Sequence, residues 1–289
     1  MTANYKFNAL KSIVQSPTLI TSLRTSYLQT GVATIPNFLS PPELKSAINS
    51  CKKNTKTTPK KTKDCFITNT KHNCYLLPSD SSFPSNHIRN RELETKVASI
   101  ANDELPKGGV LLSLYENPLF LTLISNIVLG NSANKKLLYT SMDPIGACSV
   151  NVFKADWRHG YHFDESEFSV TLMLQRPAKG GIFEMSSRLR SSGNEMVYEK
   201  VEAIVNDDGE VDSHGIERST NDDVTPLLFE PGTLSVFAGN SSLHRVTSCK
   251  GAVDRLVAVF TFSSVPGFTN SKKVQEMFWG RSATKTQME

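Results

Sequence analysis

The 289-residue sequence has no long apolar run and no strong excess of one charge. No stretch approaches the roughly eighteen apolar residues of a membrane-spanning helix, so a membrane partner is not expected. The 32 basic and 28 acidic side chains leave a net charge of +4, which is too small to predict a nucleic-acid partner. The basic residues do gather in one place, with six lysines between Lys52 and Lys63. Such a run is typical of a solvated loop, with a phosphate or an acidic partner as the alternative.

Disulfide and zinc motifs are missing as well. The five cysteines are odd in number and include no CxxC pair, which predicts reduced thiols. The N-terminal residues do not have the pattern of a secretory signal. They contain no acidic residue before Glu43, a feature that organelle transit peptides share. We expect a cytoplasmic protein, with organelle targeting as the alternative.

The first part of the chain has helical patterns. Its length favours one domain with additions over two equal domains. Apolar residues three and four positions apart predict helices over residues 1 to about 30, and "GVATIPNFLS" predicts a short strand. Ser40 and Glu43 have the spacing of a capping box before the helix "PPELKSAINSC". Residues 108–130 predict two helices separated by an Asn-Pro pair. Residues 1–137 are therefore expected to form a helical support region that includes the lysine-rich loop.

From residue 138 onward, short apolar strands alternate with turn residues. The expected strands are "CSVNVFKA", "EFSVTLMLQ", "GGIFEMSS", "GTLSVFAGN", "LHRVTSC" and "RLVAVFTFSS". Many short strands at regular spacing indicate a sandwich or barrel. We expect a mainly β fold, a double-stranded β-helix (jelly roll, cupin-like) over residues 138–268, with N-terminal supporting α-helices. Residues 193–223 are expected to form a polar insertion beside the barrel mouth. Residues 269–289 are expected to form a C-terminal tail.

The segment "WRHGYHFDESEF", residues 157–168, concentrates histidine and acidic side chains before an apolar strand. His162 and Asp164 are two positions apart, so in an extended segment both leave the same face. His244 follows a strand and a tight turn, so a barrel wall could hold it nearby. Two histidines and one carboxylate on one face of a metal leave three positions open, as in non-haem Fe(II) oxygenases. Weaker candidates, in segments expected to be irregular or polar, are His72, His87 and His214.

Arg255 begins an apolar strand eleven residues after His244. Alternation places Arg255, Val257, Val259 and Thr261 on one face, and Leu256, Ala258, Phe260 and Phe262 on the other. An arginine on the ligand-bearing face can hold a carboxylate through two charge-assisted hydrogen bonds. 2-Oxoglutarate offers it a distal carboxylate and offers iron an α-keto acid. The spacing predicts a 2-oxoglutarate-dependent oxygenase with Fe(II) as metal and 2-oxoglutarate and O2 as cosubstrates.

Longer segments resemble one family within these oxygenases. They are "HFDESEFSVTLMLQRPAKGGIFE", "HRVTSCKGAVDRLVAVFTFSSVPG", "DPIGACSVNVF" and "GVATIPNFLSPPELK". Together they resemble the radical halogenases and hydroxylases that act on free amino acids such as lysine. The halogenases of that family carry glycine where this chain has Asp164, which leaves a coordination position for halide. The carboxylate at Asp164 therefore implies the hydroxylase branch.

The resemblance also implies which residues contact an amino-acid substrate: His159, Glu165, Thr261 and Trp279. Glu165 replaces an aspartate that is common in the family, and a carboxylate there could hold a cationic or amino group. Val259 departs from the lysine enzymes, which carry a polar contact at that position. Glu167 and Glu184 are expected to be ordinary charges on the barrel.

The implied reaction is hydroxylation of an unactivated C–H of a free amino acid or a close small-molecule derivative, with release of succinate and CO2. A cationic, lysine-like substrate is one option. Alternatives are an oxygenase acting on a protein side chain or an alkylated nucleic acid, and one that desaturates, epimerises or cyclises its substrate. A non-catalytic jelly-roll binding protein is a further alternative. It would need no complete set of Asp164, His244 and Arg255.

Overall fold

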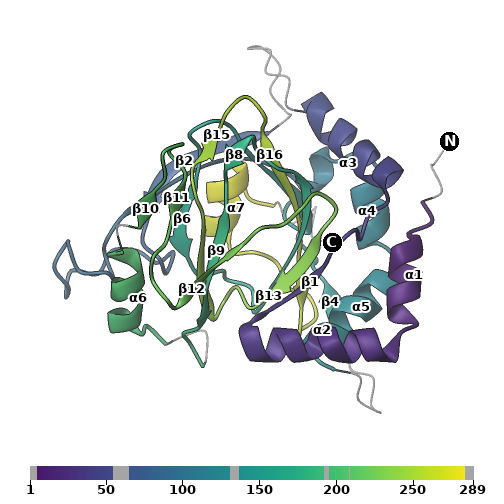
Figure 1. Ribbon diagram of the computed structural model, residues 1–289, viewed down its shortest axis with the longest axis horizontal. Coiled ribbons are helices and arrows are strands. Elements are labelled where there is room, and N and C mark those ends of the chain that lie inside the picture. Colours follow the sequence, from purple (N-terminus) through teal and green to yellow (C-terminus); the bar gives the residue numbers. More distant parts are fainter. Residues whose placement is uncertain (1–4, 55–64, 131–136, 192–194, 208, 284–289) are drawn as a thin grey trace.

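The computed structural model describes residues 5–54, 65–130, 137–191, 195–207 and 209–283. The main element is an 11-stranded sheet in the order β1-β13-β7-β16-β5-β3-β6-β14-β9-β12, with β2 paired to β3. Its strands are β1 (Val32–Ile35), β2 (Phe66–His72), β3 (Leu93–Ile100), β5 (Cys148–Phe153), β6 (His159–His162), β7 (Ser169–Gln175), β9 (Phe183–Arg188), β12 (Val224–Leu227), β13 (Leu234–Phe237), β14 (Ser242–Val246) and β16 (Arg255–Phe260). Every pairing within it is antiparallel, and the sheet curls into the half-barrel of a jelly roll (Figure 1).

Three two-stranded ladders and seven α-helices complete the described part of the chain. The ladders join β4 (Tyr139–Thr140) to β17 (Phe262–Ser263), β8 (Lys179–Gly180) to β15 (Cys249–Lys250), and β10 (Glu210–Val211) to β11 (Glu217–Arg218). The helices are α1 (Asn8–Val14), α2 (Pro17–Thr30), α3 (Pro41–Asn54), α4 (Val110–Tyr115), α5 (Pro118–Val128), α6 (Tyr198–Val205) and α7 (Lys272–Trp279), with a 3-10 turn η1 (Asn102–Glu104). Within these ranges no helix is both long and apolar enough to cross a bilayer.

The two faces of the sheet have different tasks, and β16 shows the division. Leu256, Ala258 and Phe260 belong to the main hydrophobic core, whereas Arg255, Val257 and Val259 line a cavity on the inner face. The alternation predicted for this strand is confirmed. Neighbouring β7 divides in the same way, with Val170, Leu172 and Leu174 in the core and Ser169 and Thr171 on the cavity. Because side chains alternate between the two faces of a strand, every second side chain of these strands faces the cavity inside the curled sheet.

The N-terminal helices cover the outer face (Figure 1). Phe120 of α5 is fully buried, with its ring 5.2 Å from that of Phe260 and 5.6 Å from that of Phe262. Arg24 of α2 donates to the carbonyls of Ile127 and Val128 at the end of α5, at 3.1 and 2.8 Å. The helices are thus tied both to the sheet and to one another.

The capping and strand predictions are confirmed in detail. Ser40 donates through its backbone N–H and its hydroxyl to Glu43, at 2.9 and 2.6 Å, and α3 begins at the next residue. Each of the strands expected after residue 138 is present. The lysine-rich run falls on the end of α3 and on residues 55–64, and those ten lie outside the described ranges.

Two sequence expectations were wrong. His72 does not lie in an irregular segment, because it ends β2, which pairs with β3; His87 does lie between them, outside any helix or strand. β3 also pairs with both β5 and β6. Within the insertion 193–223, α6 buries Val201 and Ile204 in a second hydrophobic cluster. Glu184 is not an ordinary charge on the barrel. It is 1% exposed, pairs with Arg245 at 2.6 Å and accepts a hydrogen bond from the insertion at Ser219.

Candidate active site

Two histidines and one aspartate converge on the inner face of the half-barrel. His162 ends β6, Asp164 follows two residues later, and His244 of β14 is the cross-strand partner of His162. The Nε2 atoms of both histidines lie 3.4 Å from Oδ1 of Asp164. His162 and His244 are 5% and 3% exposed, whereas the Asp164 side chain is 23% exposed, so the two histidines are buried and the carboxylate is partly open to solvent. This is the set that the spacing of the sequence singled out.

Backbone carbonyls orient both imidazole rings. Nδ1 of His162 lies 2.9 Å from the carbonyl oxygen of Gly160, and Nδ1 of His244 lies 2.9 Å from that of Ser242. A carbonyl can only accept, so in each neutral ring Nδ1 carries the proton and Nε2 keeps its lone pair. The two lone pairs then point to the side on which Oδ1 of Asp164 lies. Hydrogen bonds of this kind fix the tautomer of histidine ligands in metal sites.

The Asp164 carboxylate is held just as firmly. Its Oδ2 accepts a hydrogen bond from the hydroxyl of Ser169, and its backbone N–H donates to the carbonyl of Gly239 at 3.0 Å. A methyl group on Gly239 would lie 2.1 Å from Oδ2, so only glycine fits beside the carboxylate. Oδ1 is left facing the histidines.

The charges of the cluster are strongly coupled. Burial acts to raise the pKa of Asp164, but the positive charge that His244 and His162 carry when they are protonated holds that pKa well below its usual range. For His244, burial lowers the pKa, yet the Asp164 carboxylate outweighs it and raises the pKa above its usual value. For His162, burial and the charge of His244 prevail and lower the pKa. An ionised carboxylate and two imidazoles that share one small space suit a divalent cation, which would satisfy all three.

Arg255 lies on the same cavity with part of its charge unsatisfied. Its side chain is 2% exposed. Nε donates to the carbonyl of Gly181 at 3.1 Å, whereas the buried Nη1 has no partner among the described residues. Burial lowers the pKa of Arg255 to about 10. A buried guanidinium with a free N–H is costly unless an anion pairs with it, so this end of the cavity is suited to a carboxylate.

The four residues expected to contact a substrate all line the same cavity: His159, Glu165, Thr261 and Trp279. The His159 ring stacks on that of His162, with centroids 3.8 Å apart, and its Nε2 is buried without a partner among the described residues. Burial and the neighbouring His162 hold the pKa of His159 well below its usual range, so the ring is neutral. Nε1 of Trp279 is likewise buried and donates to no described atom.

The other two have partners within the protein. Thr261 donates its hydroxyl to the carbonyl of Gly146 at 2.9 Å. Glu165 is exposed at the rim, where Oε2 accepts from the Ser271 backbone N–H at 3.2 Å and Oε1 accepts from its hydroxyl at 2.6 Å. Ser271 is the N-cap of α7, so Glu165 joins the segment between β6 and β7, which also carries Asp164, to that helix.

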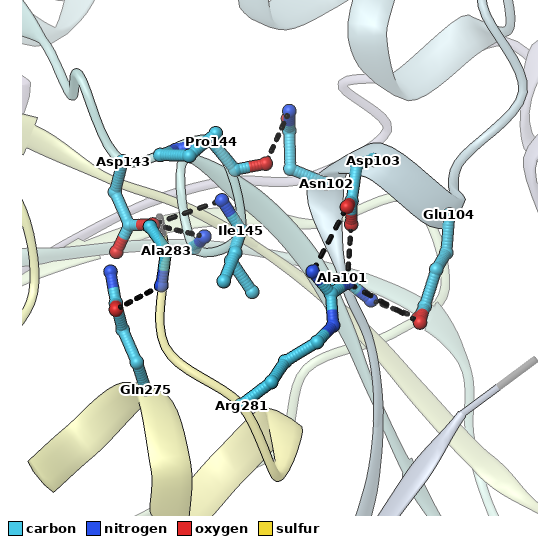
Figure 2. Close-up of polar contacts among 11 residues, drawn as sticks. Ala101, Asn102, Asp103, Glu104, Asp143, Pro144, Ile145, Gln275, Arg281 and Ala283 are labelled. Carbon is cyan, nitrogen blue, oxygen red and sulfur yellow. Dashed lines mark hydrogen bonds and ion pairs between the residues drawn. The ribbon is translucent and has the colours of Figure 1, made fainter. Parts of the chain in front are cut away.

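The segment expected to be a C-terminal tail forms one wall of the site. Helix α7 packs on β2 and β3 and lines the cavity with Val274, Phe278 and Trp279. Figure 2 shows how the chain beyond it is fastened: Arg281 binds both carboxylate oxygens of Asp103, at 3.0 and 2.6 Å, and the Ala283 N–H donates to the Gln275 side chain of α7. Together with the bonds between Glu165 and Ser271 at its N-terminus, these contacts anchor the eight-residue helix at both ends.

His72 also lies beside the site, although the sequence placed it among the weaker candidates. Its ring is 5.9 Å from that of His159 and 6.1 Å from that of His162, centroid to centroid. Its Nε2 is hydrogen-bonded to the hydroxyl of Thr95 at 2.6 Å. Thr95 of β3 is in turn the register partner of His159. His72 therefore supports the wall behind the cluster, a position that only the unpredicted strands β2 and β3 could reveal. His214 is exposed in the insertion and lines no part of this cavity.

By sequence, the chain matches no family model and no curated protein. By structure it is similar to the non-haem α-ketoglutarate-dependent carbocyclase of nogalamycin biosynthesis, with a TM-score of 0.56, 10% identity and 95% and 96% of the two chains covered. It is also similar to an oxidoreductase of the 2OG-Fe(II) oxygenase family from Burkholderia pseudomallei, with a TM-score of 0.51, 13% identity and 87% and 94% covered. A third similar structure is AviO1 from Streptomyces viridochromogenes, with a TM-score of 0.54, 12% identity and 87% and 97% covered. The chain therefore has the jelly-roll fold found in 2-oxoglutarate- and Fe(II)-dependent oxygenases.

Proposed function

We propose that this protein is an Fe(II)- and 2-oxoglutarate-dependent dioxygenase that hydroxylates an unactivated C–H of a free amino acid or a close small-molecule derivative. One observation carries the proposal. The Nε2 atoms of His162 and His244 and Oδ1 of Asp164 converge on a cavity, and the same cavity holds the buried Arg255, whose Nη1 has no partner among the described residues. The reaction consumes O2 and 2-oxoglutarate and converts R–H to R–OH, with succinate and CO2 as coproducts.

Each residue of the cluster has a definite task in this reaction. His162, Asp164 and His244 would hold the iron on one face. Arg255 would bind the distal carboxylate of 2-oxoglutarate through the guanidinium edge that Gly181 leaves free. Iron bound there supplies the activation of O2 at the expense of 2-oxoglutarate. The apolar inner face, with Phe153, Val257 and Phe237, keeps water away from these groups and strengthens the charge pairing.

The resemblance to the amino-acid halogenases and hydroxylases supports a small substrate. His159, Glu165, Thr261 and Trp279 would contact it, and all four line the cavity. The cavity has a volume of about 160 Å³, below the roughly 300 to 1,000 Å³ of typical ligand pockets, which favours a small substrate over a bulky one. The carboxylate of Asp164 favours hydroxylation, because the family's halogenases carry glycine there. A lysine-like substrate held by Glu165 would extend the resemblance further.

The test is anaerobic binding of Fe(II) and 2-oxoglutarate, followed by O2 and a panel of free amino acids, with succinate and product mass as readouts. We expect succinate coupled to a product about 16 mass units heavier, the mass of one oxygen atom. His162→Ala should abolish both, whereas His214→Ala, an exposed histidine outside the site, should not. A product two hydrogens lighter would indicate desaturation or cyclisation instead. Absence of metal binding would refute the proposal altogether.

A further inference from the structure

The charged groups of the cavity are few, and most are already engaged. Only three lining residues carry a formal charge: Asp164, Glu165 and Arg255. The proposed function assigns Asp164 to the metal and Arg255 to 2-oxoglutarate. Among the described lining residues, Glu165 alone remains to pair with a cationic group of the substrate. It lies at the exposed rim and already accepts two hydrogen bonds from Ser271.

A second carboxylate close to the cavity, Asp143, is fully engaged by hydrogen-bond donors of the protein itself. It is 1% exposed. Oδ1 accepts from the N–H groups of Ile145 and Gly146, and Oδ2 accepts from the backbone and side-chain amides of Asn270, at 2.7 to 3.2 Å. Four donors saturate the carboxylate, so an ammonium group gains little there.

The unpaired polar atoms of the substrate side are nitrogens. The indole Nε1 of Trp279 can only donate, whereas Nε2 of His159 donates or accepts according to the tautomer of its ring. Both atoms are buried, so each requires a partner that the ligand must bring. A substrate oxygen, such as one from the α-carboxylate of an amino acid, would satisfy Trp279, and it would also satisfy His159 in the tautomer with the proton on Nε2. Glu165 could then take the α-ammonium.

Part of the cavity lining is apolar, and one turn of it has a strained backbone. Leu76, Val274, Phe278 and Val259 belong to this apolar part, beside polar lining residues such as Asn270 and Ser166. Leu76 has φ +53°, a left-handed conformation that a branched side chain rarely adopts. Asn73 holds the turn, because its side chain accepts from the Leu77 N–H at 3.3 Å and donates to the Leu77 carbonyl at 2.7 Å.

Helix α7 fixes the same turn from the other side. The ammonium group of Lys273 donates to the carbonyl of Leu76. The chain thus keeps an aliphatic side chain at the cavity in a conformation that glycine or asparagine would adopt more easily. Phe7 and Val197 have similar φ values away from the cavity, so the conformation alone assigns no role. What points to a role for Leu76 is that its strained turn lies on the cavity lining and is held by both Asn73 and Lys273.

From this division of polar and apolar groups we propose that the substrate's side chain is uncharged and aliphatic, and that Leu76 determines this specificity. The inference rests on the proposed function. One carboxylate at the rim can pair with one ammonium group, so an amino acid with a single ammonium fits and lysine, with two, does not. The side chain would lie against Leu76, Val274 and Phe278.

L-Norleucine and L-lysine provide a matched test, since they differ chiefly in the terminal ammonium group. The chain has two tryptophans, Trp157 and Trp279, so Trp157→Phe makes the emission report on Trp279 alone. In this variant, loaded with Zn(II) and 2-oxoglutarate so that no turnover occurs, norleucine should shift the emission and bind at least about tenfold more tightly than lysine. Equal or tighter binding of lysine would overturn the inference and leave the oxygenase proposal intact.

A second pair of variants tests Leu76 itself. Aspartate and asparagine both tolerate the left-handed conformation, so Leu76→Asp and Leu76→Asn should fold. Leu76→Asp offers a carboxylate and should move the preference toward lysine by about tenfold. Leu76→Asn should weaken norleucine binding without a gain for lysine. An unchanged ratio in Leu76→Asp would exclude Leu76 as the specificity residue. Failure of every amino acid to yield coupled succinate would instead count against the proposed function.

Discussion

Gly239 and Asp164 lie so close that a methyl group on the glycine would be 2.1 Å from Oδ2 of the carboxylate and 2.9 Å from its Cγ. Backbone cannot yield as a flexible side chain can, so Gly239→Ala must displace the carboxylate. Positioning groups around metal ligands typically contribute about 10- to 100-fold in affinity, and we expect Gly239→Ala to lose that much for Fe(II) or Co(II). Calorimetric or spectroscopic titration would measure it. Gly215→Ala is the control for metal affinity, because Gly215 lies outside the cavity and its methyl would meet nothing within 4 Å; its φ of +73° means that this variant loses some stability as well. Equal affinities in both variants would contradict the geometry.

Replacement of Arg255 should affect 2-oxoglutarate and spare the metal. Arg255→Met removes two charge-assisted hydrogen bonds, each about 1.5 kcal/mol or more, so the affinity for 2-oxoglutarate should fall by about 100-fold or more. Arg176→Met is matched in chemistry, because Arg176 pairs with Glu230 on the surface away from the cavity. Calorimetry with a non-reacting metal would compare the two. Tight 2-oxoglutarate binding by Arg255→Met would show that the carboxylate is held elsewhere.

The Glu184–Arg245 pair should contribute more to the free energy of unfolding than an ion pair on the surface does. Removal of Arg245 leaves the charge of Glu184, whose side chain is 1% exposed, without its partner, so Arg245→Ala should cost about 3–5 kcal/mol of unfolding free energy. Glu230→Ala breaks a pair whose side chains are 42% and 68% exposed, and should cost about 1 kcal/mol or less. Urea unfolding of both variants would decide between them. Similar losses would mean that the burial of Glu184 contributes little.

Loss of the Arg281 anchor should loosen α7 without disturbing the metal ligands. In Arg281→Ala the bonds to Asp103 disappear, so the end of α7 that carries Phe278 and Trp279 gains freedom (Figure 2). We expect a red-shifted Trp279 emission and a substrate KM raised severalfold, on the order of 1 kcal/mol, with metal affinity unchanged. Lys272→Ala, which removes an exposed pair with Glu276 on the same helix, is the control. An unchanged emission and KM would show that α7 needs no such anchor.

The sequence alone determined the chemistry of the site to a large extent. Side chains two apart in an extended segment share a face, so His162 and Asp164 could be paired from their spacing, and the alternation of β16 placed Arg255 with Val257 and Val259. These inferences depend on local geometry that holds in any strand. For the same reason the capping pair of Ser40 and Glu43 was predictable.

Only the tertiary structure decided which distant segments close the cavity. Leu76 and α7 are joined by a contact between residues almost two hundred positions apart, Lys273 and Leu76. Local periodicity in the sequence cannot predict such a contact. β2 and β3 were not predicted because some of their polar residues, such as Thr68 and Thr95, are buried and hydrogen-bonded within the protein. The alternation of polar and apolar residues that identifies a half-exposed strand is therefore missing. Glu184 looked like a surface charge because its compensating partner lies 61 positions away. Local spacing in the sequence therefore identified His162, Asp164 and Arg255 as candidate site residues, while long-range packing decided which side chains surround them.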